Sequence, residues 1–307
     1  MSIYIKIIVF IFLLVTSSNV SCQVDPASVA NIVDVTSNDL DFNKIFIDKK
    51  KTKISKIDLS HWKVTLPVAN DKGKPIELES PEILDFATNE KVKPYFYNDS
   101  TDGSIVFYAF PNTTTANTKY SRSELREQIV PGDNNTNWTF EQGGRMKGKL
   151  AIEEITKDAD GKYHRVIVMQ IHGRLTNEQK ELIGAKDNNA PPILKIYWDK
   201  GKIRVKTKVL KNKAVNNTAI LLDDAWDDDE GYNFPTEVGF RKFTLEVKVE
   251  KGKMVIILNN SEYAVYEGID INRWNIFENY FKAGNYFQSK DEGSYAKVKY
   301  YELEVSH

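Results

Sequence analysis

Cysteine and histidine are both scarce in this sequence. Cys22 is the only cysteine among 307 residues, so no disulfide can form within the chain and the fold must depend on its hydrophobic core. The four histidines, His61, His164, His172 and His307, have no spacing typical of a metal site. We therefore expect no metal and no cofactor.

The chain also lacks an excess of either charge. Its formal net charge is -1, which argues against a nucleic acid as partner, because nonspecific binding to phosphates needs a basic surface. One apolar run, at 7–15, follows a lysine near the N-terminus and is too short for a transmembrane span. We expect residues 1–22 to be a signal peptide. Two locations remain open: secretion with loss of Cys22, or an outer-membrane lipoprotein anchored through Cys22.

The remaining pattern indicates a lead-in segment and one β domain. Residues 23–55 are polar with a basic run at 48–53, so we interpret them as a linker or lead-in. From 56 to 307, short alternating segments such as "HRVIVMQIH", "KIRVKTKVL" and "FTLEVKVE" are separated by turn sequences such as "DKGK", "EKGK" and "NNSE". The pattern predicts an all-β fold, a β-sandwich jelly roll of the concanavalin-like kind with a cleft on a concave sheet.

An acidic run extends from Asp223 to Glu230 in "DDAWDDDEG". Several carboxylates close together can bind calcium, which prefers oxygen ligands. A solvated loop has the same composition, and the spacing matches no known calcium loop. Both interpretations stay open.

Three segments alternate chemically capable side chains with apolar ones. In "RSELR" the polar face carries Arg122, Glu124 and Arg126, and in "QIH" it carries Gln170 and His172. In "YFKAGNYFQ" the same face carries Tyr280, Lys282, Gly284, Tyr286 and Gln288. Alone, each segment fits a surface ion-pair ladder, a structural histidine or a core tyrosine. If the three strands are neighbours, their polar faces form the floor of a groove.

These three blocks together resemble the signatures of the alginate lyases of polysaccharide lyase family 7, and "LSHWKVTLP" resembles that family's domain opening. The resemblance covers about residues 57–306. The third block usually has Asn before its final Gln, where this chain has Phe287, and we expect the change to affect packing more than chemistry.

The resemblance implies β-elimination on a 1,4-linked polyuronate, with alginate, an anionic polysaccharide, as partner. Arg122 and Gln170 would neutralise the sugar carboxylate, and His172 and Tyr286 would act as base and acid. The neighbouring groups expected to bind substrate are Arg126, Tyr280, Lys282 and Gln288, with Glu124 holding Arg122 or Arg126 in place. We expect a monomer.

Guluronate and mannuronate present the C5 proton on opposite sides, so His172 and Tyr286 would share the work on one epimer and Tyr286 would do both steps on the other. Ile171 within "QIH" favours guluronate-containing substrates in that family. Three alternatives remain: a non-catalytic carbohydrate-binding jelly roll, a lyase on another polyuronate such as glucuronan, and a glycoside hydrolase. The hydrolase needs two carboxylates across one bond, whereas Glu124 and Glu127 are expected on opposite faces of their strand.

Overall fold

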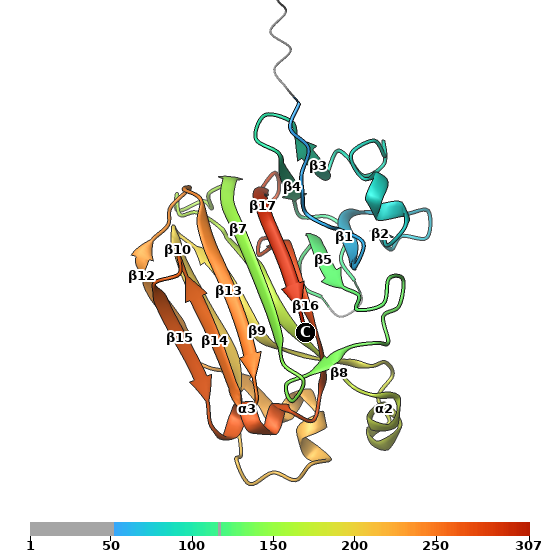
Figure 1. Cartoon of the computed structure of the whole chain (residues 1–307), viewed down its shortest axis with the longest axis vertical. Coiled ribbons are helices and arrows are strands. Elements are labelled where there is room, and N and C mark those ends of the chain that lie inside the picture. Colours follow the sequence, from blue (N-terminus) through green and yellow to red (C-terminus); the bar gives the residue numbers. More distant parts are fainter. Residues whose placement is uncertain (1–51, 116–117) are drawn as a thin grey trace, which may run out of the picture. The chain divides into compact units, whose positions relative to one another are not determined.

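The computed structural model describes residues 52–115 and 118–307. The expected signal peptide, Cys22 and the lead-in up to residue 51 lie outside the described residues. In the part that is described, two antiparallel sheets face each other as layers, with only short helices between strands (Figure 1). The all-β sandwich predicted from the alternating segments is confirmed.

The first layer, which we name the cleft sheet, has the strand order β11-β10-β9-β8-β16-β5-β1-β2, with β12 also paired to β10 and β6 to β16. Its strands are β1 (Trp62–Ala69), β2 (Pro75–Leu78), β5 (Arg122–Glu127), β6 (Trp138–Thr139), β8 (Arg165–Arg174), β9 (Asn189–Asp199), β10 (Lys202–Leu210), β11 (Trp226–Asp228), β12 (Tyr232–Glu237) and β16 (Glu278–Phe287).

The second sheet has the order β15-β14-β13-β7-β17-β4-β3. Its strands are β3 (Phe96–Asp99), β4 (Ser104–Ala109), β7 (Gly144–Ile155), β13 (Phe243–Glu250), β14 (Lys253–Leu258), β15 (Glu262–Glu267) and β17 (Ala296–Ser306). The helical segments are η3 (Glu82–Asp85), α2 (Asn177–Ile183), η4 (Ala219–Leu221), η5 (Asp223–Ala225) and α3 (Ile269–Trp274).

The turn sequences join adjacent strands as predicted. "DKGK" at 199–202 connects β9 to β10, "EKGK" at 250–253 connects β13 to β14, and "NNSE" at 259–262 connects β14 to β15. Lys200 and Gly201 lie between the paired residues Asp199 and Lys202 and have φ values of 52° and 88°, the positive φ that a two-residue type I′ hairpin needs. The hairpins therefore fix the register of these strands locally.

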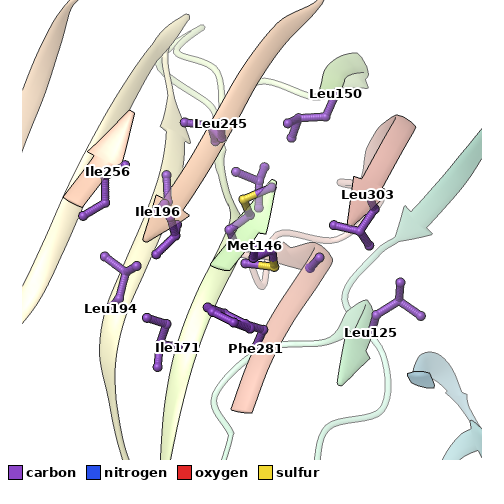
Figure 2. Close-up of a cluster of buried hydrophobic side chains, with 14 of the residues drawn as sticks. Leu125, Met146, Leu150, Ile171, Leu194, Ile196, Leu245, Ile256, Phe281 and Leu303 are labelled. Carbon is purple, nitrogen blue, oxygen red and sulfur yellow. The ribbon is translucent and has the colours of Figure 1, made fainter. Parts of the chain in front are cut away.

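The hydrophobic core lies between the two sheets (Figure 2). Leu125, Ile171 and Phe281 enter it from the cleft sheet and meet side chains of the second sheet such as Met146 and Leu245. The apolar positions of the three signature blocks therefore face inward, and the polar positions face outward. Phe287 is also fully buried, and its ring packs against the His164 ring with centroids 5.5 Å apart. Phe287, which stands where the family usually has Asn, therefore packs in the core and does not face the cleft.

The ladder between β8 and β16 is interrupted next to Gly284, where the pairing passes from Ala283–Met169 to Tyr286–Ile167. The buried Tyr300 hydroxyl, from the second sheet, accepts a hydrogen bond from the Gly284 N–H and donates one to the Val168 carbonyl. Tyr300 thus satisfies two backbone groups that the interrupted ladder leaves without partners.

The first described residues already contact the domain. The Lys53 N–H donates to the Ser100 carbonyl, and the Ser55 N–H donates to the Asn98 side chain at 2.7 Å. Within residues 52–115 and 118–307, no helix has the length and hydropathy needed to span a bilayer.

Candidate active site

β16 lies between β5 and β8, so the three signature blocks are neighbours in the cleft sheet. Lys282 is opposite both Arg126 and Gln170, and Tyr280 is opposite His172. Residues directly opposite each other in antiparallel strands share a face. The groups expected to form one groove floor are therefore brought together on the outer face of the cleft sheet.

Glu124 is the centre of this floor. The residue is 1% exposed, and its carboxylate Oε2 lies 2.9 Å from Arg122 Nη1 and 2.5 Å from Lys282 Nζ. Gln170 Nε2 donates to Oε1 at 2.5 Å. Burial opposes its ionisation, but the positive charges of Lys282 and Arg122 outweigh it and hold the pKa of Glu124 below its ordinary value. The carboxylate therefore fixes two cations and one amide in a single cluster.

Of the two arginines offered as partners of Glu124, the ion pair is formed by Arg122. Arg126 instead donates to the carbonyls of Glu127 and Asn134 and to the Asn137 side chain. Its guanidinium also lies 4.2 Å from the centroid of the Tyr280 ring. Arg126 thus joins β5 to the loop that follows it, while still facing the cleft.

His172 is held in one tautomer. Its Nδ1 lies 3.0 Å from the Gly173 carbonyl, and because a carbonyl can only accept, Nδ1 carries the proton and Nε2 keeps a lone pair. Burial and the positive charge of Lys282 lower the pKa of His172 to about 3, so the ring is neutral near pH 7. The Tyr280 ring stacks on it with centroids 5.2 Å apart and planes at 13°, which orients the imidazole.

Two further groups of the cluster have shifted protonation equilibria. Burial and the neighbouring Arg122 lower the pKa of Lys282 to about 8, against the opposing effect of Glu124. Burial raises the pKa of Tyr286, so its phenol carries a proton near pH 7. The Arg122 guanidinium lies 3.9 Å from the centroid of the Tyr286 ring. The site thus combines a neutral imidazole, a protonated phenol and fixed cations.

A cleft of about 610 Å³ lies over this floor. His172, Tyr280, Lys282, Arg122 and Arg126 line it, whereas Gln170, Glu124, Tyr286 and Gln288 are not among its lining residues. Glu124 and Gln170 lie beneath the floor, both nearly fully buried. Tyr286 meets the cleft through Arg122, which covers its ring and lines the cleft.

Gln288 follows the end of β16. Its backbone N–H donates to the Arg165 carbonyl, and its side chain donates to the Tyr286 carbonyl at 3.1 Å. The structure therefore places Gln288 beside Tyr286 and apart from the groups around His172.

Sequence reasoning missed several residues of the cleft wall. Lys63 and Thr65 alternate in "WKVTLP" and lie opposite Arg126 and Glu124, a two-residue period that could have identified them. Arg174 likewise continues the two-residue period of Gln170 and His172 on β8. Other missed lining residues come from loops and a strand end without a periodic signal, among them Asn134, Asn135, Asn188 and Asn189.

The acidic run does not gather its carboxylates at one point. Asp228 forms ion pairs with Lys195 and Lys208, and Asp229 accepts hydrogen bonds from Thr207. In the described ranges, no three His, Cys, Asp or Glu side chains converge in a way that could hold a metal ion. The Asp228 and Asp229 carboxylates are therefore already bound to protein groups.

The groove floor of arginine, lysine, glutamine, histidine and tyrosine has the features of a polysaccharide lyase, and comparison with known proteins agrees. The family model described as "Alginate lyase" matches residues 57–307. The chain belongs to this family of polysaccharide lyases.

Three relatives illustrate the likeness. The crystal structure of alginate lyase A1-II′, a member of polysaccharide lyase family 7, is 30% identical with a TM-score of 0.64, covering 82% of this chain and 96% of that one. A variant of A1-II′ in complex with the product GGG is also 30% identical, with a TM-score of 0.65 and the same coverage. An alginate lyase from Klebsiella pneumoniae is 24% identical over 297 residues, covering 82% of this chain and 90% of that protein.

Proposed function

We propose that this protein cleaves guluronate-containing blocks of alginate by β-elimination. The observation that carries the proposal is the Glu124 cluster, which fixes Arg122, Lys282 and Gln170 beside a neutral histidine with a free ring nitrogen. A buried cationic cluster next to a neutral base suits a substrate that must lose a proton beside its own carboxylate.

The first requirement of the reaction is to neutralise the uronate carboxylate. The C5 proton is barely acidic while that carboxylate keeps its full charge, because proton loss adds negative charge to the same region. Arg122 and Lys282 supply positive charge, and Gln170 supplies amide hydrogen bonds. Glu124 holds these groups in place before substrate arrives, so little reorganisation is needed.

The second requirement is a base and an acid. His172 Nε2 takes the C5 proton, and the electron pair of that C–H bond forms the C4–C5 double bond as the C4–O bond breaks. The leaving oxygen keeps the C4–O electron pair and takes the proton of the Tyr286 hydroxyl. A bound carboxylate offsets the positive charge that lowers the pKa of His172, so its basicity increases when substrate binds.

Relatives support this assignment. An A1-II′ variant with one histidine-to-asparagine and one tyrosine-to-phenylalanine substitution was obtained in complex with the substrate GGMG, and it is 28% identical to this chain. A histidine and a tyrosine are also the residue types proposed here as base and acid. Ile171 faces the core, so its association with guluronate would act through the strand that carries Gln170 and His172.

The test is the ultraviolet absorbance of the unsaturated product, measured separately on polyguluronate, polymannuronate and glucuronan. We expect the fastest rise on polyguluronate, and a loss of about 10²–10⁴-fold in rate for His172→Ala and for Tyr286→Phe, with unchanged circular dichroism. A folded protein that binds alginate without releasing unsaturated sugar would instead be a binding module. Near-normal rates in either variant would remove that residue from the mechanism.

We also propose that the mature protein is secreted, or anchored to the outer membrane through Cys22, and is a monomer. Mass spectrometry of the purified mature chain distinguishes the two locations. A lipid-anchored chain begins at Cys22 and carries the added mass of the lipid, whereas a secreted chain cleaved after Cys22 begins at Gln23. Light scattering coupled to gel filtration tests the monomer, and a doubled mass would contradict it.

A further inference from the structure

Two rows of side chains run across the cleft sheet and continue beyond the cleft. In the first row, strand pairing places Lys63, Arg126, Lys282, Gln170, Lys195 and Lys206 opposite one another in sequence from β1 to β10. In the second, it places Arg122, Tyr286, Ile167, Tyr197 and Arg204 in line from β5 to β10. Both rows begin in the proposed site and end on basic side chains of β10.

The basic side chains at the ends of these rows, together with the nearby Lys208, form a basic patch, which we define as Lys195, Arg204, Lys206 and Lys208. None of the four lines the 610 Å³ cleft. Three of them lie on β10 with the two-residue period of "RVKTK": Arg204, Lys206 and Lys208. Lys206 is opposite Lys195 of β9, so all four share one face. That face is the face of Gln170, because Lys195 lies directly opposite it.

Protein groups hold some of the basic side chains of the patch in place. Asp228 bridges Lys195 Nζ at 2.8 Å and Lys208 Nζ at 2.9 Å, with lysine side chains 16% and 15% exposed. Arg204 donates to Asn233 at 3.0 Å. Among the described residues, Lys206 forms no ion pair within 4 Å. Asp228 is the carboxylate that forms ion pairs with the patch, and it holds two of the four cations. Of its acidic neighbours, Asp227 pairs with Lys211 outside the patch and Asp229 accepts from Thr207.

We infer that the basic patch is a second binding surface for the anionic polymer, holding the uronate residues that extend from the cleft over β9 and β10. The inference rests on the proposed function, because the polymer must occupy the cleft for the patch to meet it. Neighbouring strands are about 4.8 Å apart, close to the repeat of a 1,4-linked pyranose chain. A chain lying across the strands therefore meets a new strand, and a new basic side chain, about once per sugar.

The patch predicts dependence on substrate length. A short oligosaccharide that fills the cleft does not reach Lys195 or Lys206, whereas a long chain contacts both. We expect Lys195→Gln/Lys206→Gln to raise KM for polyguluronate about fivefold, since partly exposed charge pairs are individually weak. It should leave kcat on the polymer, and both constants on a trisaccharide, unchanged. In about 0.5 M salt the difference on the polymer should shrink, because exposed charges are screened.

The matched control is Lys149→Gln/Lys248→Gln, which removes the same charge from the outer face of the second sheet, where each lysine pairs with a glutamate. It should leave KM for the polymer unchanged. Asp228 keeps Lys208 as a partner in the patch variant, so we expect the fold to be retained.

A binding arm separates failure of the inference from failure of the proposed function. The His172→Ala protein, with and without the patch substitutions, is run in gels containing polyguluronate, and retardation measures binding without turnover. Weaker retardation with the patch substitutions supports the inference. Equal retardation overturns it, as does an equal KM change on trisaccharide and polymer. Absence of unsaturated product from the unsubstituted protein overturns the proposed function, whatever the gels show.

Discussion

The outer faces of the two sheets carry similar sequences and have different environments. On β5 of the cleft sheet, the Arg122 and Glu124 side chains are 9% and 0% exposed and lie 2.9 Å apart. On the second sheet, Lys149 and Glu302 are 42% and 60% exposed and lie 3.6 Å apart. Both pairs come from strands that alternate charged with apolar residues. The comparison shows that alternation places charges on a face, whereas the surrounding strands and loops decide whether that face becomes a solvated ladder or a buried site.

The sharpest way to break this comparison is to neutralise one carboxylate on each face. Glu124→Gln leaves Arg122 and Lys282 as buried cations without a counter-charge, so we expect a loss of about 3–5 kcal/mol in unfolding free energy. Activity should fall about 10²–10³-fold because the cluster loses its alignment. Glu302→Gln should stay within about 0.5 kcal/mol with normal activity. Denaturant unfolding measures the stability of the two variants, and kcat measures their activity. Equal effects of Glu124→Gln and Glu302→Gln would contradict the distinction between a buried site and a solvated ladder.

A second comparison concerns two glycines, one in the crowded β16 of the cleft sheet and one in an open turn between β7 and β8. Gly284 has φ of 137°, and a Cβ there would lie 2.8 Å from the Ser123 carbonyl oxygen and 2.9 Å from Glu124 Cα. Backbone atoms cannot move aside easily, so Gly284→Ala should cost about 2–4 kcal/mol and disturb the cluster. Gly161, with φ of 76° and nothing within 4 Å, should cost only about 1 kcal/mol when changed to Ala. Similar costs at the two positions would show that the positive φ alone sets the cost, and that the close backbone atoms at Gly284 add nothing.

The buried lysine should give the cleft a pH dependence that exposed lysines do not. Because the pKa of Lys282 is lowered to about 8, the lysine loses its charge as pH rises through that value, and kcat/KM should fall about tenfold per pH unit above it. A guanidinium stays charged there, so Lys282→Arg should shift the fall to higher pH. If kcat/KM of this variant falls at the same pH as before, a group other than Lys282 causes the fall.

The smallest expected effect concerns the opposite face of β5, where Glu127 accepts from the Phe281 N–H at 2.9 Å and pairs with His307 at 2.7 Å. Burial alone would lower the pKa of His307, but Glu127 outweighs it and raises the pKa. The pair therefore stabilises the fold fully below the unfolded-state pKa of histidine, and this contribution is lost as pH rises through the higher folded-state pKa. His307→Gln should cost about 0.5–1 kcal/mol near pH 5.5 and less near pH 9. A cost independent of pH, measured by thermal unfolding, would argue against the ion pair.

Much of the fold could be predicted from the sequence. Period-two alternation and turn residues act within a few positions, so strands such as β10 and β13 and their hairpins could be located from local pattern alone. The face of each signature side chain followed from the same period. Phe287 illustrates this, because its parity alone placed it on the core side.

The pairing between distant strands could not be derived in this way. Nothing local to "YFKAGNYFQ" specifies that β16 enters between β5 and β8, since that choice depends on the packing of the whole sheet. For the same reason the sequence left the partner of Glu124 open between Arg122 and Arg126, and did not identify Lys282 as a second partner. The loop residues Asn134 and Asn188 had no periodic signal, so the cleft walls were missed while the floor was anticipated.

The central position of β16 has a consequence for biosynthesis. When a ribosome has made everything up to α3, β5 and β8 exist but the strand that separates them does not, so both expose unpaired backbone edges. Glu124 then lacks Lys282, and no strand yet joins β8, which carries Gln170, to β5. We therefore expect a chain shortened before Tyr280 to be inactive and prone to aggregate, and a nascent chain to gain activity only when its last strands are in place.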